Sequence, residues 1–295
     1  ETRTVKWEGQ RQSDNVEDRR AGGGSGFRMG GGRGIGIGTI IIAVLASWIF
    51  GINPLTVLGV LGGGGPAVAP QSQGPATKPP ATDAAAAFVS TVLADTEEVW
   101  GKVMQASGTR YSQPKLVLFR GAVGTACGTG QSAMGPFYCP GDQKVYLDMQ
   151  FFDTLRSRMG APGDFAQAYV VAHEVAHHLQ NQLGITGKVD GMRGRVSEQQ
   201  MNALSVRVEL QADCFAGVWA HHSQKSKGWL ERGDLEEAMN AASQIGDDNL
   251  QRKSQGMVVP ESFTHGTSQQ RMTWFKRGLE SGSVQQCNTF DAQKL

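Results

Sequence analysis

Two histidines at helical spacing are the residues whose types and positions best suit chemistry. His173 and His177 frame the sequence His-Glu-Val-Ala-His, and Glu174 follows the first histidine directly. Residues four apart share one face of an α-helix, so both imidazoles can hold a single metal ion. A carboxylate one position after the first histidine can reach a metal-bound water molecule instead of the metal. This pattern of two ligands and a general base is typical of a zinc hydrolase.

The segment around the two histidines is predicted to be a buried helix. Residues 164–172 are rich in alanine and begin with an acidic residue, and Gly184 follows as a helix end. The stretch is nearly all apolar, so we expect it to lie inside the domain. Burying histidine and glutamate side chains is costly unless they are paired or bind a metal ion, which strengthens the metal hypothesis.

A third ligand is expected from the next long helix. His178 lies about a quarter-turn off the face of the two histidines, so we expect packing and hydrogen bonds to satisfy it. Glu209 and Asp213 are four residues apart in an otherwise apolar stretch, 206–219. We predict that Glu209 binds the metal ion and that Asp213 accepts a hydrogen bond from the far nitrogen of a ligating histidine. The alternative is a solvated acidic edge, which the apolar neighbours disfavour.

These residues together predict a catalytic centre with one zinc ion per chain and water as the fourth ligand. Glu174 would take a proton from this water and pass it to the leaving amine. A further donor should stabilise the tetrahedral oxyanion. The candidates are one histidine in a loop before a helix and, more weakly, three tyrosines: His265, Tyr138, Tyr146 and Tyr169.

Two alternatives to a peptidase stay open. The chain could be a catalytically silent envelope adaptor that uses zinc only to hold its fold. The presence of Glu174 argues against this, because a structural site needs no base and usually has four protein ligands. A hydrolase that acts on cell-wall peptides would use the same zinc chemistry.

Further stretches of the chain are similar to one protein family. The stretches 173–180 and 209–217 resemble the bacterial neutral zinc metallopeptidases, the YpfJ-like proteins, and five others match as well: 7–9, 13–20, 135–140, 145–148 and 263–267. The resemblance covers nearly the whole chain and implies a membrane-anchored zinc peptidase of the Glu-ligand type. We therefore expect an α+β fold, a zincin-like and mostly helical domain with a small antiparallel sheet. The expected partner is a peptide or protein substrate of the cell envelope.

The composition divides the chain into four regions. It has 295 residues and a formal net charge of +1, too little positive charge for a nucleic-acid partner. Residues 1–33 are charged and Gly-rich and are predicted to be disordered. Residues 34–53 follow without charge and match the ~20 residues that cross a bilayer, so we predict one transmembrane helix there. A linker rich in Gly, Pro and Ala, 54–82, and the peptidase domain, 83–295, follow.

The charges that flank the uncharged segment predict its orientation. Arg19, Arg20, Arg28 and Arg33 precede it, and no basic residue follows it until Lys78. The positive side stays in the cytoplasm, so we predict a single-pass protein of the bacterial inner membrane, held in the lipid bilayer by this anchor. Its N-terminus would be cytoplasmic and its peptidase domain periplasmic or extracellular. A cleaved signal peptide and a buried core helix are the alternatives.

All four cysteines follow the predicted anchor, which agrees with an oxidising compartment. An even number suggests two disulfides and allows three pairings. We favour Cys127 with Cys139, which closes a short loop, and Cys214 with Cys287, which ties a helix to the C-terminal tail. Neither pair has zinc-finger spacing.

Periodicity and turn residues predict the elements of the peptidase domain. Asp83 should cap the first helix, and Ser197 should form a capping box with Gln200 on the longest one. The strand 144–148 is a candidate sheet edge for an extended peptide substrate, with an ordinary core strand as the equal alternative. Besides the motif helix, the expected elements are strands at 115–119 and 144–148 and helices at 84–105, 150–159, 197–222, 234–245 and 267–279.

Overall fold

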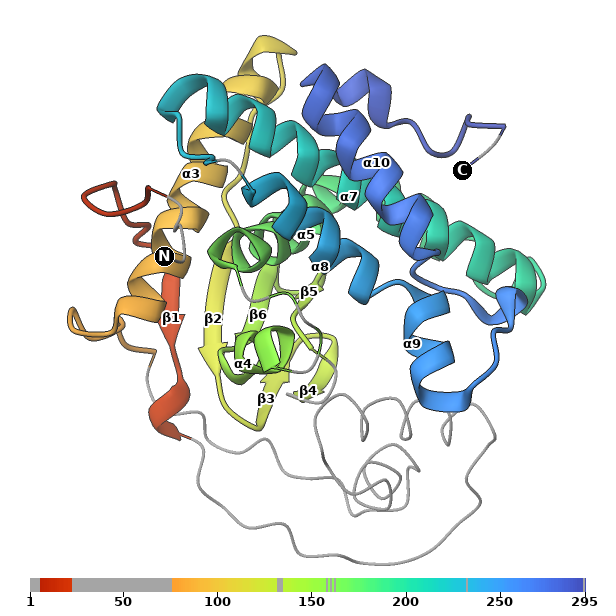
Figure 1. The fold of residues 1–295 in the computed structure, drawn as a ribbon, viewed down its shortest axis with the longest axis horizontal. Helices are drawn as coiled ribbons and strands as arrows, with labels where there is room; N and C mark the ends of the chain where they lie inside the picture. Colours follow the sequence, from red (N-terminus) through yellow and green to blue (C-terminus); the bar gives the residue numbers. More distant parts are fainter. Residues whose placement is uncertain are drawn as a thin grey trace, which may run out of the picture.

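The computed structural model describes residues 6–22, 76–131, 135–157, 159, 161, 163–231, 233–293 and 295. Within these ranges the chain has the predicted α+β class, with many helices and two small sheets. Helix α5, Asp164–Gln182, is central, because strands β5 and β6 contact one side of it and helices α7 and α8 another (Figure 1). This helix carries both histidines of the predicted metal centre.

The larger sheet is mixed, not antiparallel as the sequence predicts. Its strands follow the order β1-β2-β6-β5, of which the first three run parallel and β5 runs antiparallel to β6. A separate hairpin, β3-β4, lies in the crossover between β2 and β6. The strands are β1 Val16–Asp18, β2 Lys115–Phe119, β3 Ala122–Thr125, β4 Gly128–Gln131, β5 Phe137–Cys139 and β6 Lys144–Asp148.

Of the two alternatives for strand β6, the ordinary core strand is confirmed and the substrate edge is wrong, because β6 lies inside the sheet with a neighbour on each side. Its residues Val145 to Asp148 are all buried, which is typical of a strand covered on both faces. In the part of the chain that the structure describes, β5 is the outer strand on this side. Its three residues are too few to show a periodic pattern in the sequence.

A strand from the N-terminal region completes the sheet, although residues 1–33 are predicted to be disordered. Strand β1 pairs with β2 in the register Val16↔Leu116, and Val16 is buried. Asp18 forms an antiparallel bridge with Thr77 and accepts hydrogen bonds from Arg20. The prediction fails here because the strand is stabilised by a distant partner, which composition does not reveal.

The same pairing corrects the predicted location. A single crossing would place residues 6–22 and 76–295 on opposite sides of a membrane, but strands β1 and β2 are hydrogen-bonded. The single-pass inner-membrane topology, with a cytoplasmic N-terminus and an external domain, is therefore wrong. Among the described residues, no helix is both long and apolar enough to cross a membrane. The predicted span itself, residues 34–53, lies outside them.

Helices α3, α7 and α10 begin where a side chain satisfies a free backbone N–H group. Asp83 accepts from Ala86 N at 2.9 Å, and Ser197 and Gln200 form the predicted capping box. Helices α6 and α9 lie in segments where the sequence predicts none. The helices are α3 Ala84–Ala106, α4 Gln150–Ser157, α5, α6 Ile185–Asp190, α7 Glu198–Lys227, α8 Asp234–Gln244, α9 Asp247–Gln255 and α10 Ser268–Ser281, with 3-10 turns η1 Arg20–Gly22, η3 Pro260–Ser262 and η4 Val284–Cys287.

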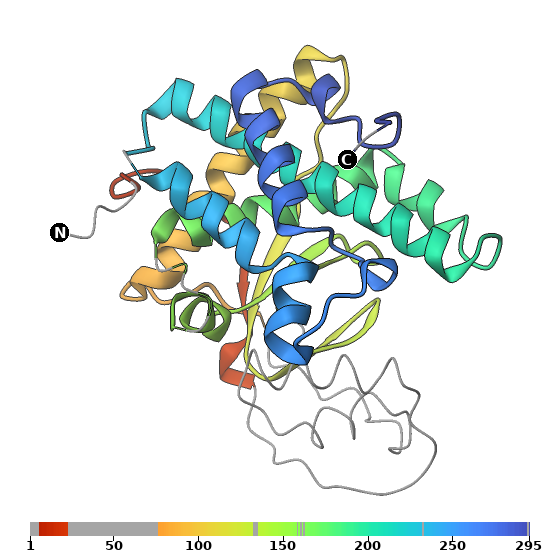
Figure 2. The same ribbon diagram turned by 45° about the vertical axis from the view of Figure 1, so that its right-hand side comes forward.

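Helices α7 and α10 lie side by side (Figures 1 and 2). Two glycines allow their backbones to come into contact. A Cβ atom on Gly217 would overlap with the carbonyl oxygen of Phe275, and one on Gly278 with that of Cys214. Any larger residue would therefore force the helices apart. Both helices contribute side chains to the metal centre, so their distance matters for its geometry.

Both favoured disulfides are confirmed. Cys127–Cys139 joins the turn of the β3-β4 hairpin to strand β5. Cys214–Cys287 joins the middle of α7 to η4, which follows α10. The second disulfide thus holds the C-terminal tail against the helix that carries Glu209.

Candidate metal centre

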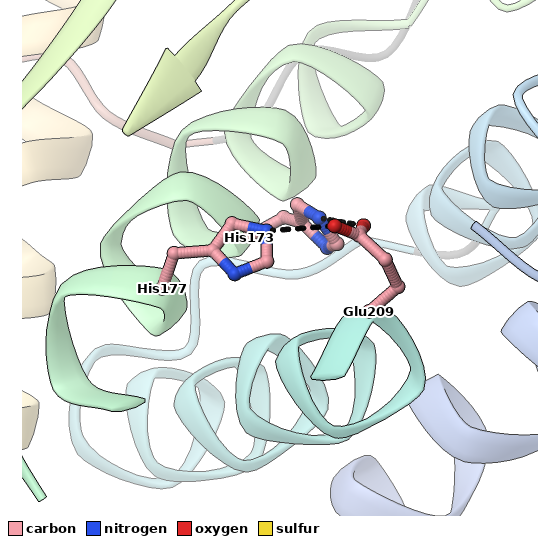
Figure 3. A group of neighbouring side chains, drawn as sticks. All are labelled: His173, His177 and Glu209. Carbon is pink, nitrogen blue, oxygen red and sulfur yellow. Dashed lines mark hydrogen bonds and ion pairs between the residues drawn. The ribbon is translucent and has the colours of Figure 1, made fainter. Parts of the chain in front are cut away.

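The three predicted ligands come from neighbouring helices and face one another (Figure 3). His173 Nε2 lies 3.2 Å from Glu209 Oε2, and His177 Nε2 lies 3.4 Å from Glu209 Oε1. One ligand atom from each side chain can be chosen such that all lie within 4.8 Å of one another. Two imidazole nitrogens and a carboxylate oxygen are a donor set that suits zinc, and three protein ligands are usual in catalytic zinc sites.

Asp213 lies behind His173, in the position that the sequence predicts. Its Oδ1 is 2.8 Å from His173 Nδ1, which directs Nε2 of the imidazole towards Glu209. Tyr169 donates its hydroxyl to the same oxygen at 2.5 Å. Arg271 of α10 donates to both oxygens, from Nε to Oδ2 at 2.8 Å and from Nη2 to Oδ1 at 3.0 Å. A buried guanidinium therefore neutralises the buried carboxylate, in the bidentate geometry that arginine favours.

His177 is held by an amide instead of a carboxylate. Its Nδ1 is 2.8 Å from Gln180 Oε1, one turn further along α5. Each of the two histidines thus has a partner for Nδ1 and presents Nε2 to Glu209. The two partners differ in charge, because Asp213 is an anion and Gln180 is neutral.

The charges of the centre shift the pKa values of its members. Burial lowers the pKa of His173, but the charge and hydrogen bond of Asp213 and the hydrogen bond of Glu209 raise it to about 10 overall. Burial raises the pKa of Glu209, but the charge of His177 and the hydrogen bond of His173 bring it well below its ordinary value. The proton on the His173 imidazole therefore stabilises the neighbouring carboxylates, and a metal ion has to displace it.

Glu174 is buried beside the ligands, with 8% of its surface exposed. Burial raises its pKa, and the charges of His177 and His173 oppose this rise only in part. Among the described residues, no hydrogen bond involves its carboxylate. A carboxylate that is unbonded and has a raised pKa suits a general base.

His265 lies in the loop before α10, and Asp247 at the start of α9 holds this loop. Asp247 Oδ1 is 3.3 Å from His265 Nδ1. Its Oδ2 accepts three consecutive backbone N–H groups, at 2.8, 2.6 and 3.1 Å, from Thr264, His265 and Gly266. The loop is therefore fixed by a single carboxylate at a helix N-terminus, where a negative charge is favourable.

The loop of His265 packs against the turn of α7 that carries Glu209. A Cβ atom on Gly266 would lie 3.1 Å from the side chain of Leu210 and 3.3 Å from that of Val206. The His265 side chain is 51% exposed, and its Nε2 has no partner among the described residues. Desolvation lowers its pKa, but the hydrogen bond with Asp247 and the charge of Glu209 raise it overall.

The three tyrosines proposed as oxyanion donors have their hydroxyl groups bonded elsewhere. Tyr146 donates to Asp142 Oδ2 at 2.7 Å, and Tyr169 donates to the carboxylate behind His173. The Tyr138 hydroxyl lies 3.0 Å from Nδ1 of His178, whose Nε2 lies 2.6 Å from a backbone carbonyl. As predicted, His178 is satisfied by hydrogen bonds away from the two ligands.

Three residues around the centre are missed by the sequence analysis: Gln180, Asp247 and Arg271. Gln180 could have been found, because it lies three residues after His177 on the same predicted helix. Asp247 and Arg271 come from elements with no fixed sequence distance to the ligands. Only the tertiary fold brings them there.

Comparison with known families identifies the class of protein. The chain belongs to the family described as "Putative neutral zinc metallopeptidase", whose model matches residues 5–290. This confirms the resemblance seen in the sequence motifs. The class agrees with the donor set of the centre, and it implies zinc as the metal.

Two relatives show how far the similarity extends. The chain is 52% identical over 294 residues to the uncharacterized protein YpfJ of Escherichia coli (strain K12), which covers 97% of this chain and 99% of that protein. It is 43% identical over 195 residues to the uncharacterized protein Rv2575 of Mycobacterium tuberculosis (strain ATCC 25618 / H37Rv), which covers 63% of this chain and 65% of that protein. No solved structure matches the chain.

Proposed function

We propose that the protein is a zinc-dependent peptidase in which His173, His177 and Glu209 hold the metal ion and Glu174 is the general base. One observation carries the proposal: three ligand atoms within 4.8 Å of one another lie beside a buried carboxylate that no described residue bonds. A purely structural zinc site usually has four protein ligands and needs no base. The combination of three ligands and a base therefore supports catalysis.

Each residue of the centre would have its own role in peptide hydrolysis. Zinc, when bound, would polarise the scissile carbonyl and lower the pKa of a water molecule. Glu174 would accept the proton of the attacking water and deliver it to the leaving amine. Asp213 would keep the proton on Nδ1 of His173, so that Nε2 stays a ligand. His265 would donate from Nε2 to the developing oxyanion, with Asp247 fixing its other nitrogen.

An extended peptide is the substrate that fits the sheet. In the described chain, strand β5 pairs with β6 on one side and with no other strand. The Tyr138 hydroxyl on β5 is hydrogen-bonded to His178 and Asn181 of α5, so this strand lies beside the motif helix. A peptide could add to the free side of β5 through main-chain hydrogen bonds.

The test begins with the metal. We expect about one zinc ion per purified chain, measured by mass spectrometry of the metal, and its loss in Glu209→Ala. Glu174→Gln should keep the zinc and lose cleavage in a library of fluorogenic peptides. Zinc retained without Glu209 would contradict the ligand set. Zinc binding without cleavage of any peptide would favour the silent adaptor.

A further inference from the structure

The second nitrogen of His177 begins a chain of buried hydrogen bonds that the proposed mechanism does not use. Nδ1 of His177 lies 2.8 Å from Gln180 Oε1, and Gln180 Nε2 lies 3.0 Å from Gln211 Oε1. Gln211 Nε2 then lies 3.1 Å from the backbone oxygen of Cys287. Both glutamine side chains are buried, at 0% and 5% exposure. A buried amide is costly unless all its polar atoms are bonded, so this arrangement is specific.

The geometry fixes the orientation of both amides. The far end of the chain is a backbone carbonyl, Cys287 O, which can only accept, so Gln211 must point its nitrogen there and its oxygen at Gln180. Gln180 faces two acceptors, Gln211 Oε1 and, at 2.8 Å, the backbone oxygen of Val208. Its nitrogen must therefore lie on that side and its oxygen towards His177. The only hydrogen bond that His177 Nδ1 can make with this oxygen is as a donor.

The carbonyl at the end of the chain is itself held in place. Cys287 is disulfide-bonded to Cys214 of α7. Two residues further on, the Thr289 hydroxyl donates to the backbone oxygen of Arg207 at 2.6 Å. The tail therefore cannot rotate to offer a donor in place of the carbonyl oxygen.

We propose that Gln180 is a positioning residue that holds His177 with its proton on Nδ1 and its Nε2 lone pair directed at the metal position. The backbone oxygen of Val208 and the Gln211 amide, itself oriented by the carbonyl of Cys287, fix the Gln180 amide in the orientation that this requires. A histidine must offer a lone pair to bind a metal ion, and the partner of its other nitrogen decides which nitrogen offers it. The proposal rests on the proposed function only for the identity of the metal.

The experiment compares three buried glutamines in the full-length chain. Gln180→Met removes the acceptor of His177. Gln211→Met removes one of the two acceptors that fix the Gln180 amide and leaves the other, the backbone oxygen of Val208. Gln251→Met is the matched control, because Gln251 is 7% exposed and bonds Ser262 and the backbone of Val259 instead. The first readout is zinc affinity by competition with a chromophoric chelator. The second is the ¹H–¹⁵N NMR signal of His177 Nδ1–H in the zinc-free protein.

We expect Gln180→Met to weaken zinc binding about 10- to 100-fold, the range known for partners of ligating histidines. Gln211→Met should weaken it less, and Gln251→Met should leave it unchanged. The Nδ1–H signal should be slow to exchange in the wild type and lost in Gln180→Met. Because Gln211→Met keeps the Gln180 contact, it tests the proposal even where Gln180→Met folds poorly.

Two outcomes would overturn the proposal. The first is wild-type zinc affinity and an intact Nδ1–H signal in Gln180→Met. The second is an equal loss of affinity in Gln251→Met, which would show a general effect of buried-amide removal. A wild-type protein that binds zinc but cleaves no peptide would refute the peptidase function alone. A wild-type protein that binds no zinc would refute the metal assignment, while the NMR signal would still decide the role of Gln180.

Discussion

Removal of the Arg271 guanidinium should destabilise the protein strongly, because it leaves a buried carboxylate without its cation. Arg271 is 2% exposed and Asp213 is fully buried, and two hydrogen bonds of 2.8 and 3.0 Å join them. Loss of one partner of a buried ion pair typically costs about 3–5 kcal/mol, several times the value of an exposed pair. Arg271→Met keeps most of the side-chain length and removes only the charge and the donors. We therefore expect a loss of about 3–5 kcal/mol in the free energy of unfolding.

Urea unfolding followed by circular dichroism measures this loss directly. For a folded part of this size the same loss corresponds to a decrease of ~6–20 °C in Tm. Arg277→Met is the matched control on the same helix, since Arg277 is exposed and its guanidinium lies 4.4 Å above the ring of Trp274. Such an exposed cation–π contact contributes only about 0.5–1 kcal/mol.

The outcome for Arg271→Lys separates charge from geometry. Lysine keeps the positive charge but cannot form the two parallel hydrogen bonds. We therefore expect Arg271→Lys to lose less free energy of unfolding than Arg271→Met and more than Arg277→Met. A loss below about 1 kcal/mol in Arg271→Met would refute the reasoning. It would mean that Asp213 is already neutral, or that Tyr169 and His173 satisfy it without the guanidinium.

Three further predictions concern other parts of the molecule. Gly278→Ala should cost about 1–3 kcal/mol in urea unfolding because its Cβ would overlap with the backbone of α7, whereas Gly101→Ala, with open space around it, should not destabilise. Hydrogen bonds from the guanidinium of Arg20 hold the pKa of Asp18 below its ordinary value. The contribution of Asp18 to stability is therefore complete above about pH 5 and is lost as the pH falls through the lowered pKa. Asp18→Asn should lower the urea midpoint at about pH 7 and much less at about pH 2. Asp247→Asn should leave the zinc content unchanged and shift the pH profile of peptide cleavage. It should slow cleavage about tenfold, less than the roughly 10²-fold expected on removal of an oxyanion donor such as His265.

The ligand helices could be predicted from the sequence because their signals are local. The histidine pair, and Glu209 with Asp213, each lie within one helix, where spacing determines which side chains share a face. The capping box at Ser197 is equally local. Glu209 and Asp213 lie one turn apart, so both carboxylates can face the same neighbouring helix. In the structure Asp213 contacts His173 of that helix.

The sheet and the location could not be predicted in the same way. Strands β1 and β5 have three residues each, too short for a periodic pattern, and both are stabilised by partners that only the fold supplies. A run of uncharged residues indicates a membrane span when its flanks are treated as independent. The pairing of Val16, before the run, with Leu116, after it, excludes a single crossing between them. The run itself lies outside the described residues. Local composition was therefore overruled by a long-range contact.

The histidine motif alone does not make the metal centre. The ligands come from α5 and α7, but two of the groups that orient the imidazoles come from later in the chain: the guanidinium of Arg271 and the carbonyl of Cys287. Backbone contact at Gly217 and the disulfide of η4 fix both groups against α7. The C-terminal part of the chain therefore acts on the ligands without supplying one. Substitutions there should change metal affinity even though they leave the ligands and Glu174 untouched.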